Sequence, residues 1–357
     1  MANMLDYIKE NGNTAFQEEK INEIDNLIFS RLSYLPFEEI KIEEKETFEI
    51  IAQKLQDIDI KKFNMKKDKE LIKLVGKSNR YKDLLVTDYY FSRDDKKEKQ
   101  FVAITIHLEN EEIYISYSGT DDTLVGWKED FNLSFITNIP AQSEALKYIR
   151  RVSKKYNSKI HLGGHSKGGN LAVYAGIFCS KKVQDRIIDI TNFDGPGFDK
   201  TVIEKEKYKR VLNKINTYIP QSSLFGRLLE HEEKYIIVTS DQYTLMQHDI
   251  FSWRINNHQI EKANKVTAGS DFMNETVRNW LKTTSPKQRE HFINTLYEII
   301  TKTKAKTFKE FTAEWTKNVG IILKSYKDIS YEDKKEIGKM ILTFFTAVKD
   351  TIMEKVI

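Results

Sequence analysis

The chain has 357 residues and a net charge of +4, with 40% hydrophobic and 31% charged residues. These values are typical of a folded globular protein, and they argue against a disordered chain and against a membrane-embedded one. Lysines are mixed with acidic residues, and no basic run is interleaved with aromatic residues, so the sequence gives no support for nucleic-acid binding.

Cysteine content and the N-terminal segment bear on the compartment. Cys179 is the single cysteine, which excludes an internal disulfide and favours a reducing environment. The segment MANMLDYIKE does not have the charged start and apolar run of a secretion signal. No apolar run reaches the ~18 residues of a membrane span. We therefore expect a cytoplasmic protein without a transmembrane segment.

Residues 1–85 are expected to be mainly helical. Between residues 21 and 35, apolar residues recur at helical spacing until Pro36 ends the run. From residue 86 the pattern changes. Residues 100–120 are expected to form two strands joined by a polar turn, and residues 93–100 a solvated turn between strands.

Helix and strand patterns then alternate along the chain. Helices are expected at 143–156 and 168–180, and strands at 159–164, 186–198, 213–220 and 234–240. Alternation of this kind predicts the α/β class, with a mostly parallel sheet covered by helices on both faces.

After residue 264 the pattern is helical again. Ser285 and Pro286 are suited to start one helix, a capping box of Thr307 and Glu310 is suited to start another, and residues 337–356 repeat apolar positions at helical spacing. We expect one domain over residues 1–264, with residues 1–85 as its helical N-terminal part, and a helical C-terminal extension over residues 265–357.

The segment KIHLGGHSKGGNLAVYAG places Gly164, Ser166 and Gly168 between a predicted strand and a predicted helix. A nucleophile elbow needs this context, because the serine occupies a strained bend and its neighbours must lack bulk. The start of the helix also favours negative charge developing at the serine. The alternative is a glycine-rich packing turn with a bystander serine. The strand-to-helix context favours the nucleophile.

A general base is expected after the nucleophile in chain order, which discards His107, His161 and His165. Four histidines follow Ser166: His231, His248, His258 and His291. His291 belongs to the helical tail, and the charges around His231 suggest a solvated helix end. His248 lies in a loop after the last predicted strand, where we expect Met246, Ile250, Phe251 and Trp253 to anchor the surroundings. We therefore favour His248, with His258 and His231 as alternatives.

Four segments in order resemble class 3 lipases and, more closely, a bacterial family of lipase-like α/β-hydrolases, the Mbeg-like group. They are NEIDNLIFSRLSYLPF, ISYSGTDDTLVGWKEDF, GGHSKGGNLAVYA and FDGPGF…YIPQSS…MQHDIFSW, and they span roughly residues 20 to 255. The resemblance implies an α/β-hydrolase fold.

The resemblance also implies an oxyanion hole. Gly119 and Thr120 match the lipase pair that ends a strand, so the hydroxyl and N–H of Thr120 and the backbone N–H of Lys167 are expected to bind an oxyanion. Alternatively, Thr120 is a helix cap with Asp122 and Thr123 nearby. A metal site at Asp121 and Asp122 is rejected because no matching ligand cluster follows.

The chain departs from the lipase pattern at two places. Lys167, a cation, stands where lipases have leucine after the serine. The loop after the 213–220 strand, which carries the acid in lipases, offers Gln221, Ser222 and Ser223 and no carboxylate.

We expect Asp194 to supply the acid instead. It ends the preceding strand, before the rigid Gly-Pro-Gly turn, and we predict that it lies within hydrogen-bonding reach of His248. The alternative is an Asx-turn residue that caps its own loop. Asp241 and Glu230 are weaker rivals.

The sequence therefore predicts a serine hydrolase that cleaves carboxylic esters of lipid or acyl compounds through an acyl-enzyme on Ser166, without a cofactor. The expected partner is a small-molecule or lipid ester, and peripheral contact with a membrane is compatible with the sequence. A thioesterase or peptidase would use the same residues. The alternative of another class is a non-catalytic hydrolase-fold scaffold that binds a partner, since the usual acid is missing.

Overall fold

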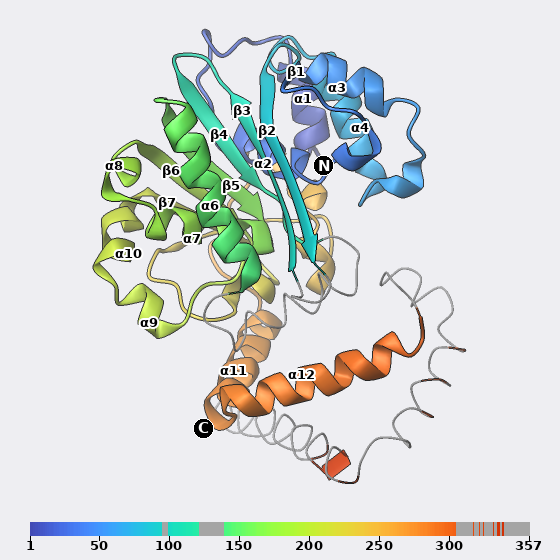
Figure 1. Cartoon of the computed structure of the whole chain (residues 1–357), viewed down its shortest axis with the longest axis vertical. Coiled ribbons are helices and arrows are strands. Elements are labelled where there is room, and N and C mark those ends of the chain that lie inside the picture. The colour runs from blue at the N-terminus through green and yellow to red at the C-terminus, as the bar shows by residue number, and fades with distance from the viewer. Residues whose placement is uncertain are drawn as a thin grey trace. The chain divides into compact units, whose positions relative to one another are not determined.

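The structure is a computed structural model, and it describes residues 1–94, 99–120 and 139–304, with the separate residues 317, 321, 324, 331, 334, 335 and 338 (Figure 1). It contains two compact units. The first comprises Met1–Arg93, Phe101–Gly119 and Pro140–Thr267, and the second comprises Asp94–Gln100, Thr120–Ile139 and Ala268–Ile357.

The N-terminal part of the first unit is helical, as its pattern predicts. Its helices are α1 (Met4–Asn11), α2 (Glu23–Leu32), α3 (Phe48–Leu55) and α4 (Lys66–Val75), with the short 3-10 helices η1 (Phe37–Glu39) and η2 (Ile60–Lys62). Asn3 and Asn22 cap α1 and α2 through side chains that accept backbone N–H groups. A short strand, β1 (Lys45–Thr47), lies among these helices and was not expected from the sequence.

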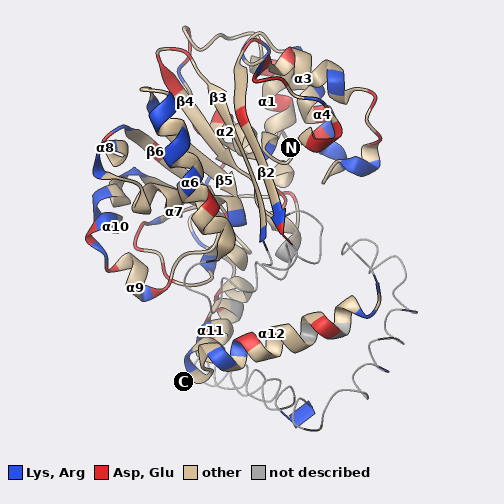
Figure 2. Cartoon of the chain, in the orientation of Figure 1, with Lys and Arg blue, Asp and Glu red and all other residues tan. Residues whose placement is uncertain are grey.

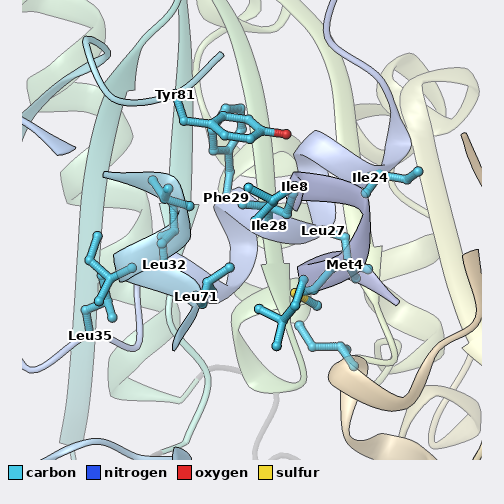
Figure 3. Packing of buried hydrophobic residues seen from close by; sticks show 14 of the residues in the cluster. Met4, Ile8, Ile24, Leu27, Ile28, Phe29, Leu32, Leu35, Leu71 and Tyr81 are labelled. Atoms are coloured by element: carbon cyan, nitrogen blue, oxygen red, sulfur yellow. The ribbon is translucent and has the colours of Figure 1, made fainter. Parts of the chain in front are cut away.

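The apolar stripe predicted around residues 21–35 lies mainly on α2 and forms the centre of the core. Its helical members are fully buried: Ile24, Leu27, Ile28, Phe29 and Leu32. Figure 3 shows them among Met4 and Ile8 of α1, Leu71 of α4 and Tyr81. The helix ends at Leu32, with Ser33 as its C-cap, four residues before Pro36.

Two buried ion pairs connect these N-terminal helices to the chain around them. Arg80 binds both carboxylate oxygens of Asp25, and neither side chain is exposed to solvent. Arg31 binds Asp68 in the same two-pronged way, at 2.6 and 2.7 Å. A buried charge that loses its partner is costly, so each pair holds its two segments together.

The sheet of the first unit has eight strands in sequence order, from β1 to β8. The strands after β1 are β2 (Leu85–Asp94), β3 (Lys99–His107), β4 (Glu112–Tyr117), β5 (Lys159–His165), β6 (Ile187–Phe193), β7 (Ile215–Pro220) and β8 (Tyr235–Val238). β1 pairs with β2, and β3 with β4, in antiparallel fashion, whereas the strands from β4 to β8 are parallel to one another. The carboxyl ends of these parallel strands therefore share one edge of the sheet.

Helices cover both faces of this sheet (Figure 1). The later helices are α6 (Pro140–Lys155), α7 (Lys167–Phe178), α8 (Lys181–Gln184), α9 (Lys200–Ile203) and α10 (Glu206–Val211). α7 packs against β5, β6 and α6, whereas α2 packs against β4 and β5. Leu162 and Gly163 alternate along β5, with Leu162 close to α7 and Gly163 close to Ser30 of α2. The predicted class is confirmed, and the fold is that of an α/β-hydrolase.

Short elements follow the parallel strands and carry the loops of the site. They are η5 (Phe225–Arg227), η6 (Thr244–His248), η7 (Ile250–Ser252), β9 (Ile255–Asn256) and β10 (Gln259–Ile260), whereas the 3-10 helix η4 (Leu212–Lys214) directly precedes β7.

The second unit contains two described helices, α11 (Ala268–Thr283) and α12 (Pro286–Thr301). As predicted, Ser285 caps α12: its side chain accepts a hydrogen bond from the backbone N–H of Gln288. Pro286 is in the first turn of the helix. The helices predicted at 307–323 and 337–356 lie outside the continuously described residues, and the boundary at residue 264 stays a prediction. Among the helices that the structure describes, none is long and apolar enough to cross a membrane.

Candidate active site

Ser166 occupies the turn between β5 and α7, as the sequence predicts. β5 ends at His165 and α7 begins at Lys167, which leaves Ser166 alone between strand and helix. Its backbone has φ 58° and ψ −132°. Strain of this kind costs a non-glycine residue about 1–3 kcal/mol and is frequent at functional sites. The turn is held by hydrogen bonds from the Ser166 N–H to the Phe193 carbonyl and from the Gly169 N–H to the Ser166 carbonyl.

Glycines on both sides of Ser166 allow this turn. A Cβ added to Gly164 would lie 2.3 Å from the carbonyl carbon of Gly168, and one added to Gly168 would lie 2.1 Å from the Tyr117 carbonyl oxygen. Neither position therefore has room for a side chain. The G-x-S-x-G spacing is therefore a requirement of the close approach of β4, β5 and α7, which supports the elbow over a packing turn of arbitrary sequence.

Ser166, His248 and Asp194 are connected in series by two hydrogen bonds. Ser166 Oγ is 3.0 Å from His248 Nε2, and His248 Nδ1 is 2.6 Å from Asp194 Oδ2. His248 ends η6 after β8, and Asp194 directly follows β6. Asp194 is inaccessible to solvent, whereas the His248 side chain is 23% exposed and so can be reached from outside. The catalytic roles assigned to these three residues stay predictions.

The loop after β7 holds Asp194 although it contributes no carboxylate. Asp194 Oδ1 accepts hydrogen bonds from Ser223 Oγ at 2.5 Å and from the Gly226 N–H at 3.1 Å. With Oδ1 occupied by two donors, Oδ2 is the oxygen that faces His248. Sequence reasoning missed Ser223 and Gly226, because the only signal was that this loop had lost its expected acid.

The surroundings of His248 agree only in part with the prediction. Ile250, Phe251 and Trp253 are buried as expected, and the Trp253 indole N–H donates to the Gln247 carbonyl at 2.8 Å. Met246 was expected to anchor the loop, but this was wrong, since its side chain is 64% exposed.

The environment predicted for His231 was also wrong. Its side chain is only 3% exposed and its Nδ1 lies 2.9 Å from Glu233 Oε1, so it is part of a buried network and not a solvated helix end. Burial raises the pKa of Glu233, but hydrogen bonds from His231, Thr217 and Tyr208 outweigh it and lower that pKa to about 2.

The other candidate bases and acids have different surroundings. His258 lies in a turn with φ 59°, and its ring contacts Tyr7 at a centroid distance of 5.9 Å. His291 is exposed on α12. Asp241 is paired with Arg254 and the N-terminal amine, and the backbone of Glu230 bridges to Phe198.

The residues expected at the oxyanion hole are described in part. Gly119 fills a tight space, because an added Cβ would lie 2.0 Å from the Tyr34 hydroxyl and 2.7 Å from the His165 carbonyl oxygen. Thr120 is assigned to the second unit, and residues 121–123, including the alternative cap partners, lie outside the described residues. Lys167 was expected as a cation beside the site; its side chain is 1% exposed, so it is buried at the first residue of α7.

A hollow of about 550 Å³ lies elsewhere on the described surface. Basic side chains of α6 line it: Lys147, Arg150, Arg151, Lys154 and Lys155. They account for much of the blue on α6 in Figure 2. None of them belongs to the Ser166–His248–Asp194 set, and lysine and arginine side chains alone form no nucleophile–base pair. Over the described ranges, no cluster of histidine, cysteine and acidic residues could hold a metal ion.

Solved structures similar to this chain include the M37 lipase and the Rhizomucor miehei lipase–propeptide complex. The M37 lipase is 16% identical, with a TM-score of 0.39 over 58% of this chain and 70% of that one. The Rhizomucor miehei complex is 14% identical, with a TM-score of 0.37 over 60% and 67% of the two chains. A search of curated proteins found no match. The model of the Mbeg1-like family matches residues 75–298, which is more than half of the chain. The resemblance seen in the sequence is therefore confirmed, and the chain belongs to the Mbeg1-like family.

Proposed function

We propose that this protein is a serine hydrolase that cleaves carboxylic esters of lipid or other acyl compounds through an acyl-enzyme on Ser166. The proposal rests mainly on the two hydrogen bonds that run from Ser166 Oγ to His248 Nε2 and from His248 Nδ1 to Asp194 Oδ2. A serine hydroxyl is a weak nucleophile until a base takes its proton, and the base needs an acid to hold its tautomer.

In the acylation step, Ser166 Oγ attacks the ester carbonyl carbon while His248 Nε2 takes the hydroxyl proton. The Asp194 carboxylate stabilises the resulting imidazolium through Nδ1–H. The backbone N–H of Lys167 and the hydroxyl and N–H of Thr120 bind the oxyanion. The imidazolium then protonates the leaving alcohol, and the acyl group stays on Ser166.

In the deacylation step, water enters where the alcohol left. His248 takes a proton from the water, which attacks the acyl-enzyme, and then returns a proton to Ser166 as the carboxylic acid leaves. The scheme uses no cofactor.

Exposed apolar side chains near His248 support an acyl substrate of apolar character. The Phe225 ring lies 4.5 Å from the His248 ring and is 37% exposed, and Met246, two residues before His248, is 64% exposed. Apolar surface of this kind gains free energy when an alkyl chain covers it, at about 25 cal/mol per Å². Esters of longer acyl chains should therefore have the lower KM.

A non-catalytic scaffold was the alternative from a different class, and its basis was the missing acid. The 2.6 Å contact of Asp194 with His248 favours the enzyme over the scaffold, because it supports Asp194 as the acid. A thioesterase or peptidase would use the same nucleophile, base and acid, so substrate comparison distinguishes these enzymes.

A fluorophosphonate probe tests the proposal, because it labels only an activated serine. The wild type should be labelled and the Ser166→Ala variant should not, while Ser222→Ala, a matched change in the loop after β7, should label normally. A panel of nitrophenyl esters of increasing chain length, with one thioester and one amide, then identifies the bond that is cleaved. Equal labelling of Ser166→Ala, or a wild type that neither labels nor hydrolyses any member of the panel, would refute the proposal.

A cytoplasmic location is part of the same proposal. It is supported by the single cysteine, Cys179, because a chain without an internal disulfide is typical of a reducing compartment. Cell fractionation with detection of the native protein tests it, and recovery outside the cytoplasmic fraction would contradict it.

A further inference from the structure

His165, which chain order discards as a base, contacts the candidate base directly. Its Nε2 lies 2.8 Å from the backbone carbonyl oxygen of His248. The two imidazole rings are 4.5 Å apart between centroids, with 37° between their planes. His165 therefore contacts both the main chain and the ring of His248.

The hydrogen bond to a carbonyl determines the tautomer of His165. A carbonyl oxygen only accepts, so Nε2 of His165 carries the proton and donates it. Nδ1 then has no proton and is an acceptor. It lies 3.3 Å from the oxygen of the Tyr34 hydroxyl, and that hydroxyl donates to the His165 carbonyl oxygen at 2.9 Å.

His165 stays uncharged at neutral pH. Burial lowers its pKa well below the ordinary value; a positive charge on His248, when that ring is protonated, and the charge of Arg31 lower it further. This matters for the chemistry, because an uncharged ring does not repel the positive charge that His248 gains when it takes the Ser166 proton.

His165 is itself held by the N-terminal helices. The guanidinium of Arg31 lies 4.2 Å from the centre of the Tyr34 ring, and Arg31 is fixed by its buried ion pair with Asp68. A continuous series of contacts thus runs from Asp68 on α4 through Arg31, Tyr34 and His165 to the His248 carbonyl.

We propose that His165 is a positioning residue that anchors the main chain of His248, so that the imidazole stays in line with Ser166 and Asp194. The need arises because His248 is the last residue of the short helix η6, two residues before η7 begins, and does not belong to a long regular element. A misplacement of about 1 Å in such a group can lower the rate about a hundredfold. The kinetic part of this inference rests on the proposed function.

The test compares three variants. His165→Phe keeps a flat ring but loses the donor, whereas His165→Gln keeps an N–H near the position of Nε2. His161→Gln is the matched control. His161 is also buried on β5, but it pairs with Asp189 and Glu112 and not with the Ser166–His248–Asp194 set. For each variant we would measure kcat and KM on a short nitrophenyl ester, stability by denaturant unfolding, and the His248 tautomer by long-range 1H–15N spectra of histidine-labelled protein.

We expect His165→Phe to lower kcat at least tenfold with KM changed less than twofold, and to replace the single Nδ1–H tautomer of His248 by a mixture. His165→Gln should restore kcat to within about threefold of the wild type. His161→Gln should lower stability only. The proposal is overturned if His165→Phe keeps kcat and the tautomer, if His165→Gln is as impaired as His165→Phe, or if His161→Gln lowers kcat equally.

The tautomer measurement separates this inference from the proposed function. If the wild type hydrolyses no ester and binds no probe, the proposed function fails. The spectra of His165→Phe then decide the positioning role alone: a disturbed His248 tautomer supports it, and an unchanged one refutes it.

Discussion

Replacing Asp194 by asparagine changes the chemistry of the candidate active site without changing its shape. The substitution exchanges one carboxylate oxygen for an NH2 group, and the two oxygens of Asp194 have different partners. Oδ1 accepts from Ser223 Oγ and from the Gly226 N–H, while Oδ2 faces His248 Nδ1. The new amide oxygen must face the two donors, so the NH2 group faces His248. Nδ1 then becomes an acceptor, and the proton moves to Nε2, where it blocks transfer from Ser166.

The size of the effect follows from the hydrogen bonds that hold the amide. Turning the amide over would take the acceptor from the Ser223 hydroxyl, at about 1–3 kcal/mol, while the Gly226 N–H keeps its second acceptor, Ser223 Oγ, at 3.1 Å. A tenfold population ratio corresponds to about 1.4 kcal/mol, so at least about fivefold more of the protein holds the unproductive tautomer. The imidazolium also loses its carboxylate. We expect Asp194→Asn to lower kcat/KM more than about a hundredfold, on the order of 10³–10⁴.

The assay is hydrolysis of a short nitrophenyl ester, with unfolding measured in parallel. The double variant Asp194→Asn with Ser223→Ala is the informative control. It removes one of the two donors that orient the amide, so it should recover about tenfold of the lost rate. Activity of Asp194→Asn within tenfold of the wild type would refute the role of Asp194. No recovery in the double variant would refute the orientation argument.

Three further substitutions test parts of the same structure. Gly226→Ala should lower kcat/KM at least tenfold in a folded protein, because the added Cβ would lie 2.4 Å from Asp194 Oδ1; ester hydrolysis measures it, and unchanged kinetics would contradict the crowding. Glu233→Gln should destabilise the protein by at most about 3 kcal/mol at neutral pH, because the pKa of Glu233 is lowered from 4.5 to about 2. That stabilisation is complete above pH 4.5 and is lost as the pH falls towards 2, so unfolding curves of wild type and variant should converge over this range. Arg80→Met should cost about 3–5 kcal/mol by leaving the Asp25 charge buried without its partner, and Asp25→Asn in the same chain should recover part of the loss in denaturant unfolding.

The features that local sequence pattern determines were predictable. Alternating helix and strand periods predict the parallel sheet, and Gly164 and Gly168 on either side of Ser166 predict the elbow, because backbone crowding there is a matter of a few neighbouring residues. The proximity of Asp194 and His248 could be proposed because both follow parallel strands, whose carboxyl ends share one edge.

Features that depend on long-range contact were not predictable. His231 looked solvated because its neighbours in sequence are charged, but Thr217 and Tyr208 accompany it in a buried network from other elements. Met246 is apolar and yet exposed. The hydrogen bond from Ser223 to Asp194 joins residues that are 29 positions apart in the chain, and a single sequence has no pattern that indicates such a contact.

The position of Asp194, the proposed acid, suggests how the candidate site differs from the lipase pattern. Strands β6 and β7 are parallel neighbours, and the Asp194 N–H donates to the Tyr218 carbonyl, so the loops after both strands begin side by side. A carboxylate on either loop could reach the histidine, and here the loop after β7 supplies Ser223 as a donor to the Asp194 carboxylate, directly after β6. Ser223→Asp would put a carboxylate on the loop that carries the acid in lipases. The new carboxylate and that of Asp194 would then be neighbours, and two neighbouring carboxylates cannot both be ionised. We therefore expect this variant to lose activity at neutral pH and not to gain it, and a rate of ester hydrolysis at or above that of the wild type would show that the two loops act independently.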